Sequence, residues 1–275
     1  MGRSIQFLGI AQMVVETKKS LGQHWLHDPA SLQAMVDAAD VQPGQTVLEI
    51  GPGTGTLTEY LLSAGARVVA LEFDQDLLPG LQNRFEGDAN FSLVHGDIRT
   101  FNLIELPAGY KVVANIPYYL TSNLVQLLSE SSNPPACAVL LIQKEVAERA
   151  CAQSGNMSIL SITTQFYWQA SLGPLVPAAL FTPPPKVDSQ ILILQGRPEP
   201  LFPDVEPRAF FRLVKAGFSQ KRKTLLNSLS GGLNLDKVTT NQLLSRAEVP
   251  PTSRPQSLTL HDWYRLLRAQ STANS

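Results

Sequence analysis

Cysteine is rare in this sequence, and long apolar runs are missing from it. Cys137 and Cys151 are the only two cysteines among 275 residues, and neither has a neighbour at metal-ligand spacing. We therefore expect reduced thiols in a reducing, cytoplasmic compartment, and no metal site. No apolar stretch approaches the about 18 residues that a membrane-spanning helix requires, so we expect no membrane segment.

Charged residues are also sparse, at 16% of the chain, and the formal net charge is only −1. This small value hides an asymmetry between two parts of the chain. Residues 208–275 contain eleven Lys/Arg and three Asp/Glu, a net charge of +8, whereas residues 1–207 contain eleven and twenty, a net charge of −9. A short stretch with so much positive charge predicts a surface that binds a polyanion such as nucleic acid.

Proline and charge together suggest how the chain is organised. Residues 1–16 carry too little positive charge for a targeting segment, so we expect a disordered tail, with Met13 as an alternative start. Four prolines fall within residues 197–207, which predicts a linker at 198–207. We therefore expect a larger catalytic domain at residues 17–197 and a small all-helical domain at residues 208–275.

Short apolar runs alternate with helical patterns over the first two-thirds of the chain. The runs predict strands at 46–50, 67–72, 91–94, 111–115 and 136–142, and the patterns between them predict helices at 29–39, 56–64, 76–85 and 120–129. This alternation predicts an α/β fold: a mainly parallel, Rossmann-like sheet with helices on both faces. Two further strands are expected at 161–167 and 190–194, joined by an irregular Pro-rich connection at 173–185, as an antiparallel edge.

A glycine-rich loop, residues 49–55, follows the first predicted strand and opens a helix. Its glycines, Gly51, Gly53 and Gly55, allow a sharp turn and a close approach of the backbone to a ligand. Thr56 stands where a dinucleotide-binding loop has its third glycine, and no Lys follows as it does in a phosphate-binding loop. Glu49 disfavours a pyrophosphate and suits a ligand with an ammonium group, such as S-adenosylmethionine (SAM).

Polar residues stand at the ends of the next predicted strands. Glu72 lies twenty-one residues after Gly51, a spacing at which a carboxylate accepts hydrogen bonds from ribose hydroxyls. Asp97 follows the third strand, where it could accept from the amino group of the cofactor's adenine, and Asn115 ends the fourth. Because open α/β sheets bind ligands at the carboxyl ends of their strands, these positions predict a single cofactor site.

The tetrapeptide Asn115-Ile116-Pro117-Tyr118 is suited to holding a planar amino group. The Asn115 side-chain oxygen and a neighbouring carbonyl can accept from an exocyclic NH₂, while Pro117 fixes the turn and has no N–H to compete. The Tyr118 ring can stack on the base that carries the amine. Beside a SAM site, this predicts methylation of adenine N6. Taken alone, the tetrapeptide also fits a Pro-aromatic turn that closes a strand.

Together with further motifs, these residues make the chain resemble the small-subunit ribosomal RNA adenine N6,N6-dimethyltransferases of the KsgA type. The further motifs are Lys19–Leu26, Gln143–Val146, Phe181–Ser189, Phe218–Lys223 and Leu226–Leu229. With the glycine loop they extend from near residue 18 to the last helix. One departure is found in the first motif, where His24 and Trp25 replace the usual Asn and Phe.

The resemblance implies a SAM-binding catalytic domain and an RNA-binding helical domain. With the glycine loop it assigns the cofactor to Gln23, His24, Leu26, Glu49, Gly51, Gly53, Gly55, Glu72, Asp97 and Asn115. It implies that Asn115 and the Ile116 carbonyl hold the target amine beside Pro117, and that Tyr118 and Phe181 sandwich an extruded adenine. RNA phosphates are assigned to Arg208, Arg212, Lys215, Lys221, Arg222 and Lys223. The implied partner is small-subunit rRNA or an immature small ribosomal subunit, bound by a monomer.

The expected mechanism is direct in-line methyl transfer, with catalysis by positioning and electrostatics and no dedicated general base. Two other functions share most of these features. A large-subunit rRNA adenine methyltransferase of the antibiotic-resistance type would have the same fold and a similar tetrapeptide, but the Phe218–Lys223 segment favours the small-subunit enzyme. A non-catalytic nucleic-acid-binding or assembly factor of the same superfamily would have lost the tetrapeptide, which here is intact.

Overall fold

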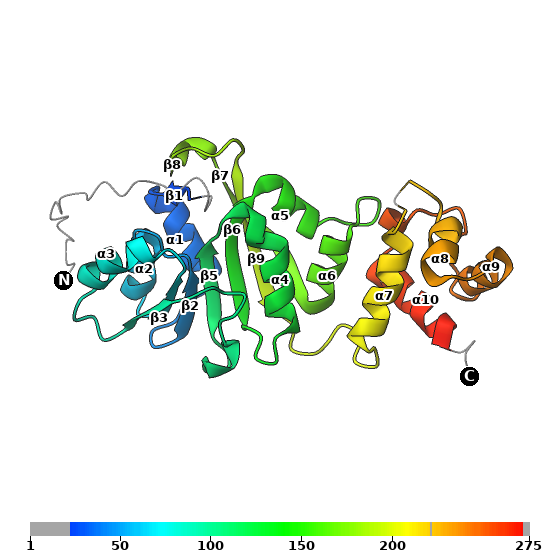
Figure 1. The fold of residues 1–275 in the computed structure, drawn as a ribbon, viewed down its shortest axis with the longest axis horizontal. Helices are drawn as coiled ribbons and strands as arrows, with labels where there is room; N and C mark the ends of the chain where they lie inside the picture. Colours follow the sequence, from blue (N-terminus) through cyan, green and yellow to red (C-terminus); the bar gives the residue numbers. More distant parts are fainter. Residues whose placement is uncertain (1–22, 221, 272–275) are drawn as a thin grey trace.

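The computed structural model describes residues 23–220 and 222–271 and contains one seven-stranded sheet (Figure 1). Its strand order is β4-β3-β2-β5-β6-β9-β7. The bounds are β2 Thr46–Ile50, β3 Arg67–Glu72, β4 Phe91–His95, β5 Lys111–Asn115, β6 Cys137–Gln143, β7 Trp168–Val176 and β9 Ser189–Gly196. The first five strands in this order, from β4 to β6, pair in parallel, and β9 and β7 add an antiparallel edge. The predicted α/β sheet with its antiparallel edge is therefore confirmed.

Helices cover both faces of the sheet because side chains of the central strands alternate between two apolar layers. Helices α1 (Pro29–Ala38) and α2 (Thr56–Ser63) pack on one layer, which includes Val47 of β2 and Val113 of β5. Helices α4 (Thr121–Glu130) and α5 (Lys144–Ala150) pack on the other, which includes Leu48 and Val112. Helix α3 (Leu78–Arg84) lies against β4.

A short two-stranded ribbon stands apart from the main sheet. Strand β1 (Trp25–Leu26) pairs with β8 (Phe181–Thr182) in antiparallel orientation, with Leu26 opposite Phe181. The ribbon ties two segments that are far apart in sequence. The remaining short elements are 3₁₀ turns: η2 Gln75–Leu77, η3 Leu103–Glu105, η4 Tyr118–Leu120, η5 Ala178–Leu180 and η6 Pro255–Ser257.

The expectation of a strand at residues 161–167 is wrong, because this segment forms helix α6 (Ile159–Tyr167). Ser158 and Ser161 form a reciprocal capping box, in which each side chain accepts from the other residue's backbone N–H. Ile162 and Phe166, four residues apart, then face the same apolar core. Residues 173–176, expected to be irregular, belong instead to β7, an edge strand in which Pro174 costs no ladder hydrogen bond.

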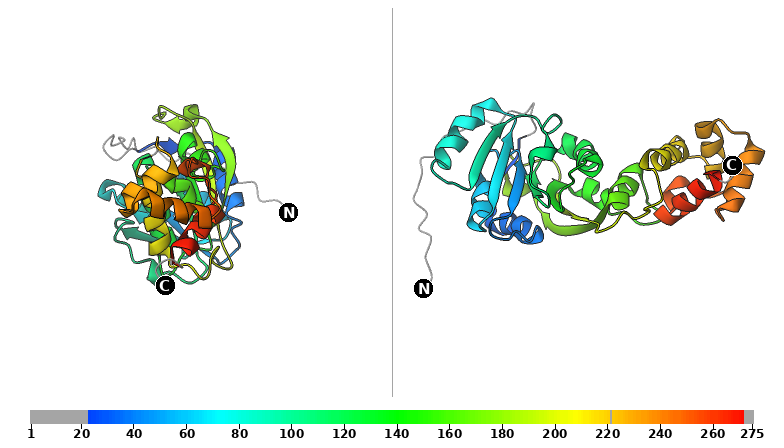
Figure 2. Two further views of the ribbon diagram at one scale, coloured as in Figure 1. Left: turned by 90° about the vertical axis from the view of Figure 1, so that its right-hand side faces the viewer. Right: turned by 90° about the horizontal axis from the view of Figure 1, so that it is seen from below.

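The chain after residue 206 is helical, as expected. Helices α7 (Pro207–Phe218), α8 (Leu225–Leu233), α9 (Lys237–Arg246) and α10 (Leu260–Ser271) surround an apolar core to which α6 also contributes. The helices approach closely where Gly217 meets Trp263, since a Cβ at Gly217 would lie 2.3 Å from the indole ring. This helical module extends from the β7 side of the sheet, so the molecule has two lobes (Figure 2).

Helix α6 connects the two lobes. Phe166 packs against Phe210 and Phe211 of α7 at ring-centroid distances of 4.8 and 5.1 Å, although α6 also contacts α4, α5 and β7. Before α6, the N–H groups of Gly155 and Met157 both donate to the Gln256 carbonyl, at 2.9 and 3.0 Å. The helical core therefore includes part of the segment that the sequence assigned to the catalytic domain, and the boundary at 197–208 stays a prediction.

Among the described helices, none combines the length and apolar character needed to cross a membrane.

Candidate active site

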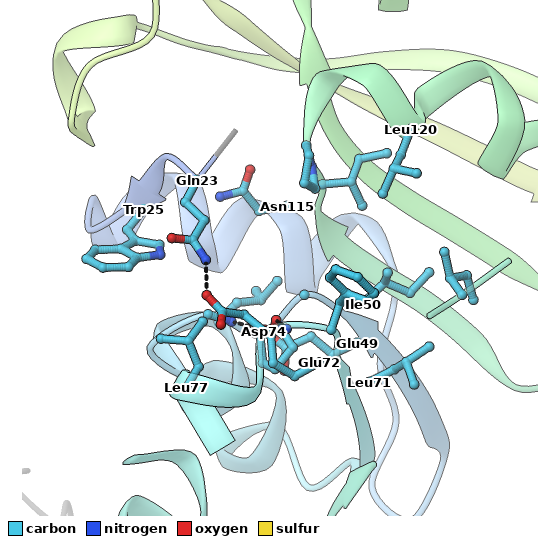
Figure 3. A pocket seen from close by; sticks show the side chains of 18 of the residues that line it. Gln23, Trp25, Glu49, Ile50, Leu71, Glu72, Asp74, Leu77, Asn115 and Leu120 are labelled. Atoms are coloured by element: carbon cyan, nitrogen blue, oxygen red, sulfur yellow. Dashed lines mark hydrogen bonds between the residues drawn. The ribbon is translucent and has the colours of Figure 1, made fainter. Parts of the chain in front are cut away.

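A pocket opens where the parallel strands end, bounded by β1, the glycine loop, the ends of β3 to β5, and η4 (Figure 3). The structure brings most of the predicted site residues together in its lining: Gln23, His24, Leu26, Glu49, Gly51, Gly53, Glu72, Asp97, Asn115, Pro117 and Tyr118. Gly55 and Phe181 do not line it. The clustering follows from topology, because β3, β2 and β5 are neighbours whose carboxyl ends share one edge.

Glu72 is held at the end of β3 by backbone N–H groups. Its two carboxylate oxygens accept from Asp74 N–H at 2.7 Å and from Gly53 N–H at 3.2 Å. Burial raises the pKa of Glu72, and these hydrogen bonds oppose the rise. Gly51 and Gly53 have φ values of +69° and +60°, and the Cβ position of Gly51 has no atom within 4 Å. A ligand can therefore approach the loop backbone while the Glu72 carboxyl is fixed beside it.

Glu49, which the sequence predicts to suit an ammonium group, is buried near the end of β2. Its side chain is 1% exposed and accepts a hydrogen bond from the Thr58 hydroxyl at 2.6 Å. Burial raises the pKa of Glu49 to about 8, so most molecules carry a neutral Glu49 at pH 7. A cation bound next to Glu49 would favour the ionised carboxylate. The predicted affinity for an ammonium group is therefore kept, but binding is coupled to loss of a proton from Glu49.

Asp97 already has a cationic partner at the pocket rim. The Arg99 Nε donates to both Asp97 carboxylate oxygens, at 3.0 and 2.9 Å, and the backbone N–H of Arg99 donates as well. These contacts lower the pKa of Asp97 and keep the carboxylate ionised. The carboxylate is thus fixed in position at the pocket by donors from Arg99.

Asn115 is oriented by the strap formed by residues 23–26. Its side-chain Nδ2 donates to the His24 carbonyl at 3.1 Å, which assigns the amide and leaves the Oδ1 atom as an acceptor. Pro117 is extended, with ψ of 134°, and its carbonyl accepts from Leu120 N–H to start η4. The tetrapeptide therefore does close a strand, as its alternative interpretation requires, and it also supplies Asn115, whose Oδ1 is an acceptor, to the pocket lining.

Tyr118 and His24 are in ring contact. Their ring centroids are 6.0 Å apart with an interplanar angle of 22°. The Tyr118 hydroxyl lies 2.9 Å from Ser189 Oγ, and His24 Nδ1 lies 2.7 Å from the Pro183 carbonyl, to which it donates. The Tyr118 and His24 rings are therefore each fixed by a polar contact with a neighbouring residue, so their positions at the pocket are defined without a ligand.

Phe181 is not brought into the pocket. Its side chain is 3% exposed and packs with Leu26 and Val176 in the apolar layer beside α1 and α2. The ring that faces Tyr118 in this structure belongs to His24. The predicted sandwich of Tyr118 and Phe181 is not assembled here because β8 pairing turns Phe181 inward, and Phe181 as a wall for the base stays a prediction.

A hydrogen bond across the pocket joins two of the segments that line it. Gln23 Nε2 donates to Asp74 Oδ2 at 2.9 Å, which links the strap to the turn after β3 (Figure 3). Trp25 lies above the glycine loop, and its indole would be 3.3 Å from a Cβ at Gly53. The strap is thus attached on both sides of the glycine loop. The close approach of Trp25 to this loop requires a glycine at residue 53.

The predicted RNA-binding residues lie on the surface of the helical module. Arg208, Arg212 and Lys215 are exposed on α7, and Arg222 and Lys223 are exposed in the turn that follows it. Lys221 lies outside the described residues. Arg208 lies in the first turn of α7, whereas Arg222 and Lys223 follow the other end of this helix. The basic residues therefore do not form a single cluster, but extend along one helix and its terminal loop.

Sequence reasoning missed several lining residues: Trp25, Phe73, Asp74, Arg99 and Tyr119. Phe73 and Tyr119 directly follow predicted site residues, and such exposed rings beside a polar strand end are a usable signal. Asp74 bonds to Gln23, which only the fold brings near, whereas Arg99 bonds to Asp97, two residues before it in the sequence. Among the described residues, no group of three or more His, Cys, Asp or Glu side chains could hold a metal ion.

Comparison with known proteins agrees with this site. A family model described as ribosomal RNA adenine dimethylase matches residues 14–266. Ribosomal RNA small subunit methyltransferase A of Synechococcus sp. (strain JA-3-3Ab) is 42% identical over 259 residues, covering 90% of this chain and 91% of the relative. The protein of the same name from Dehalococcoides mccartyi (strain CBDB1) is 39% identical over 255 residues, covering 92% and 88%.

Solved structures are similar over the same extent. A dimethyladenosine transferase from Plasmodium falciparum superposes with a TM-score of 0.78 at 29% identity, covering 91% of this chain and 98% of that one. The 23S rRNA methyltransferase ErmE superposes with a TM-score of 0.73 at 28% identity, covering 90% and 99%. Both lobes are thus shared with RNA-modifying proteins, and the family resemblance seen in the sequence is confirmed: the chain belongs to the ribosomal RNA adenine dimethylase family.

Proposed function

We propose that this protein transfers methyl groups from SAM to N6 of two adjacent adenosines in a hairpin loop near the 3′ end of small-subunit rRNA. The product is N6,N6-dimethyladenosine, made during small-subunit biogenesis. The observation that carries the proposal is the orientation of Asn115. Its Nδ2 is engaged by the His24 carbonyl, so its Oδ1 remains to accept from an amine in the pocket that holds the glycine loop and Glu72.

The residues present fit SAM as the cofactor. Glu72 would accept from the ribose hydroxyls, and Asp97 would accept from the adenine amine. Gly51 would let the methionyl part approach the backbone, with Glu49 nearby for its ammonium group. When bound, SAM supplies an electrophilic methyl group on its sulfonium. Phe73, whose ring is 55% exposed directly after Glu72, offers a surface on which the cofactor's adenine can stack.

The chain's own contribution to transfer is to position and polarise the target amine. The N6 lone pair of adenine is delocalised into the ring and is a poor nucleophile. Acceptors at Asn115 Oδ1 and the Ile116 carbonyl would bind the two N6 hydrogens and favour a pyramidal nitrogen, which turns its lone pair toward the methyl. The nitrogen becomes acidic as its bond to the methyl forms, so its proton can pass to water without a side-chain base.

The target adenine must leave its helical stack to enter the pocket, and Tyr118 offers the ring on which it can stack. The exposed basic residues of α7 and Arg222–Lys223 would hold RNA phosphates outside the pocket. We further propose that the protein acts as a monomer in the cytoplasm, on small-subunit rRNA or an immature small subunit.

A large-subunit rRNA remains the second candidate substrate, because ErmE has the same architecture. The relatives named small subunit methyltransferase A support the first candidate, at 36% to 42% identity over about nine-tenths of the chain. The test is to incubate the protein with tritiated SAM and either ribosomal subunit lacking the modification, followed by mass spectrometry of the digested RNA. We expect label in the small subunit as dimethyladenosine, and label confined to the large subunit would contradict the proposal.

A further inference from the structure

Two large aromatic side chains are unusually exposed in the described part of the molecule, and both belong to the pocket lining. Phe73 is 55% exposed and Tyr119 is 62% exposed. Phe73 follows the residue proposed to bind the cofactor's ribose, so the cofactor accounts for it. Tyr119 follows Tyr118, the residue proposed to receive the target base, and nothing in the proposed reaction uses it. An exposed aromatic ring at the mouth of an RNA-modifying site offers a surface on which a nucleobase can stack.

A cationic side chain lines the same pocket. Arg99 lies four residues after the end of β4, its side chain is 62% exposed, and it contributes to the pocket lining together with Tyr119. Asp97 holds the Nε edge of the guanidinium at 2.9 and 3.0 Å. A planar group bonded along one edge still presents its faces, so Tyr119 and Arg99 form a rim with an aromatic and a cationic surface.

The backbone sets the distance between the rim and the base-binding ring. Tyr118 and Tyr119 are consecutive residues of the turn η4, with Cα atoms about 3.8 Å apart. The Tyr118 hydroxyl is held inward by Ser189, whereas Tyr119 points to solvent. Two adjacent nucleotides of one RNA strand are joined by a single phosphodiester. When one base enters the pocket, its neighbour must therefore remain at the mouth, within reach of this rim.

We propose that Tyr119, with Arg99 beside it, is the stacking surface for the unpaired nucleobase adjacent to the target adenosine. The proposal rests on the function proposed above and specifies how its substrate is bound. A nucleobase fits this rim better than a protein side chain does, because an aromatic face and a guanidinium together favour a flat π system attached to a phosphate. The rim would also hold the second adenosine of the pair while the first is in the pocket.

The test measures RNA affinity directly. An RNA hairpin with two adjacent loop adenosines is compared with the same hairpin in which the neighbour of the target is abasic, each titrated with wild-type protein, Tyr119→Ala and Tyr119→Phe. Loss of one base stack should weaken binding of the intact hairpin to Tyr119→Ala by roughly 5- to 100-fold. Tyr119→Phe keeps the ring and should recover most of this affinity. The abasic hairpin should bind wild type and Tyr119→Ala equally, because the stacking partner is already gone.

Controls separate this effect from others. Ile104→Ala removes an equally exposed side chain, 66% exposed and outside the pocket lining, and should leave RNA affinity unchanged. The SAM dissociation constant of Tyr119→Ala, measured by calorimetry, should stay at the wild-type value. Full affinity of Tyr119→Ala for the intact hairpin, or independent and additive losses from the variant and the abasic site, would overturn the stacking surface.

The stacking surface and the proposed methyltransferase function are contradicted by different results. If wild-type protein methylates the hairpin or the small subunit but Tyr119→Ala binds the hairpin normally, only the stacking surface is wrong. If wild-type protein methylates neither, the proposed function is wrong and the stacking surface loses its occupant with it.

Discussion

The pocket and the basic surface of the helical module handle charge in opposite ways. In the pocket, Glu49 and Glu72 are 1% and 5% exposed, each has a defined hydrogen-bond partner, and burial raises the pKa of both. On the module, Arg212, Lys215 and Arg222 are exposed to solvent. The pocket therefore depends on the position of single atoms, whereas the basic surface depends on the sum of charges that salt can screen.

This difference predicts how the two regions respond to substitution. In a buried and preorganised site, removal of one acceptor leaves the reacting group misplaced, and the loss is large. On an exposed polyanion-binding surface, each charge contributes a similar small amount, and losses accumulate gradually. The four predictions that follow test the contrast, from the largest expected effect to the smallest.

The largest effect is expected for Asn115→Ala. Without Oδ1 the target amine loses an acceptor that acts mainly in the transition state, so kcat should fall roughly a thousandfold, on the order of 4 kcal/mol. SAM affinity, measured by calorimetry, should stay within a few-fold of wild type. Asn123→Ala is the matched control, since Asn123 is exposed on α4 outside the pocket lining. Near-normal turnover by Asn115→Ala would mean that another group holds N6.

The second prediction tests whether the two regions fold as separate units. Phe166 is 5% exposed and packs on Phe202, Phe210 and Phe211 from a helix that also contacts α4 and α5. Phe166→Ala should lower the free energy of unfolding by about 3 kcal/mol through the cavity that it leaves. Far-UV and near-UV circular dichroism should still report one shared transition. Two separate transitions would show that α6 does not couple the lobes, and Ile104→Ala serves as an exposed control.

Helix α6 also shows where sequence reasoning fails. The β-branched run Ile162-Thr163-Thr164 has strand propensity, but the capping box and the spacing of Ile162 and Phe166 decide the structure. The spacing of Ile162 and Phe166 predicts a helix only once the apolar surface of α7 that faces them is known. The strands of the parallel sheet were predictable because each is a short apolar run buried on both faces.

The candidate site was predictable to the extent that its residues stand at strand ends. Glu72, Asp97 and Asn115 were placed by that rule, and they line one pocket. Phe181 lies outside the pocket lining, and its orientation depends on pairing with β1, a contact across more than 150 residues that no local pattern encodes. The protonation of Glu49 was equally hidden, since it results from burial beneath α2 rather than from the residue type.

The third prediction concerns the pH dependence that this burial causes. Glu49 has a folded-state pKa of about 8, above its unfolded value, so the folded protein binds a proton that the unfolded chain loses near pH 4.5. Its contribution to stability is fully present at low pH and falls as pH rises toward 8, on the order of 1 kcal/mol per pH unit. Glu49→Gln is neutral at every pH and can still accept from Thr58, so this fall should become smaller.

The measurement is the free energy of unfolding in urea between pH 5 and 9, for wild type and Glu49→Gln. Glu72, whose pKa is also raised, contributes a fall of the same sign, so the variant should retain part of the slope. Gln242→Glu, a change on the exposed side of α9 with the opposite charge difference, controls for net charge. Parallel curves for wild type and Glu49→Gln would show that Glu49 ionises normally in the folded protein.

The smallest effect is expected on the basic surface, and it sharpens the contrast with Asn115 most directly. Arg222→Ala with Lys223→Ala should weaken RNA binding by roughly tenfold at moderate salt and lower the slope of log K against log salt by about 1.5, because two phosphate contacts are lost. Turnover at saturating RNA should be unchanged, since neither residue reaches the pocket. Lys237→Ala with Arg246→Ala removes the same charge from α9 and should change the slope less. Equal slopes in the two double variants would mean that the module acts through its net charge alone, and that the loop after α7 has no special place in binding RNA.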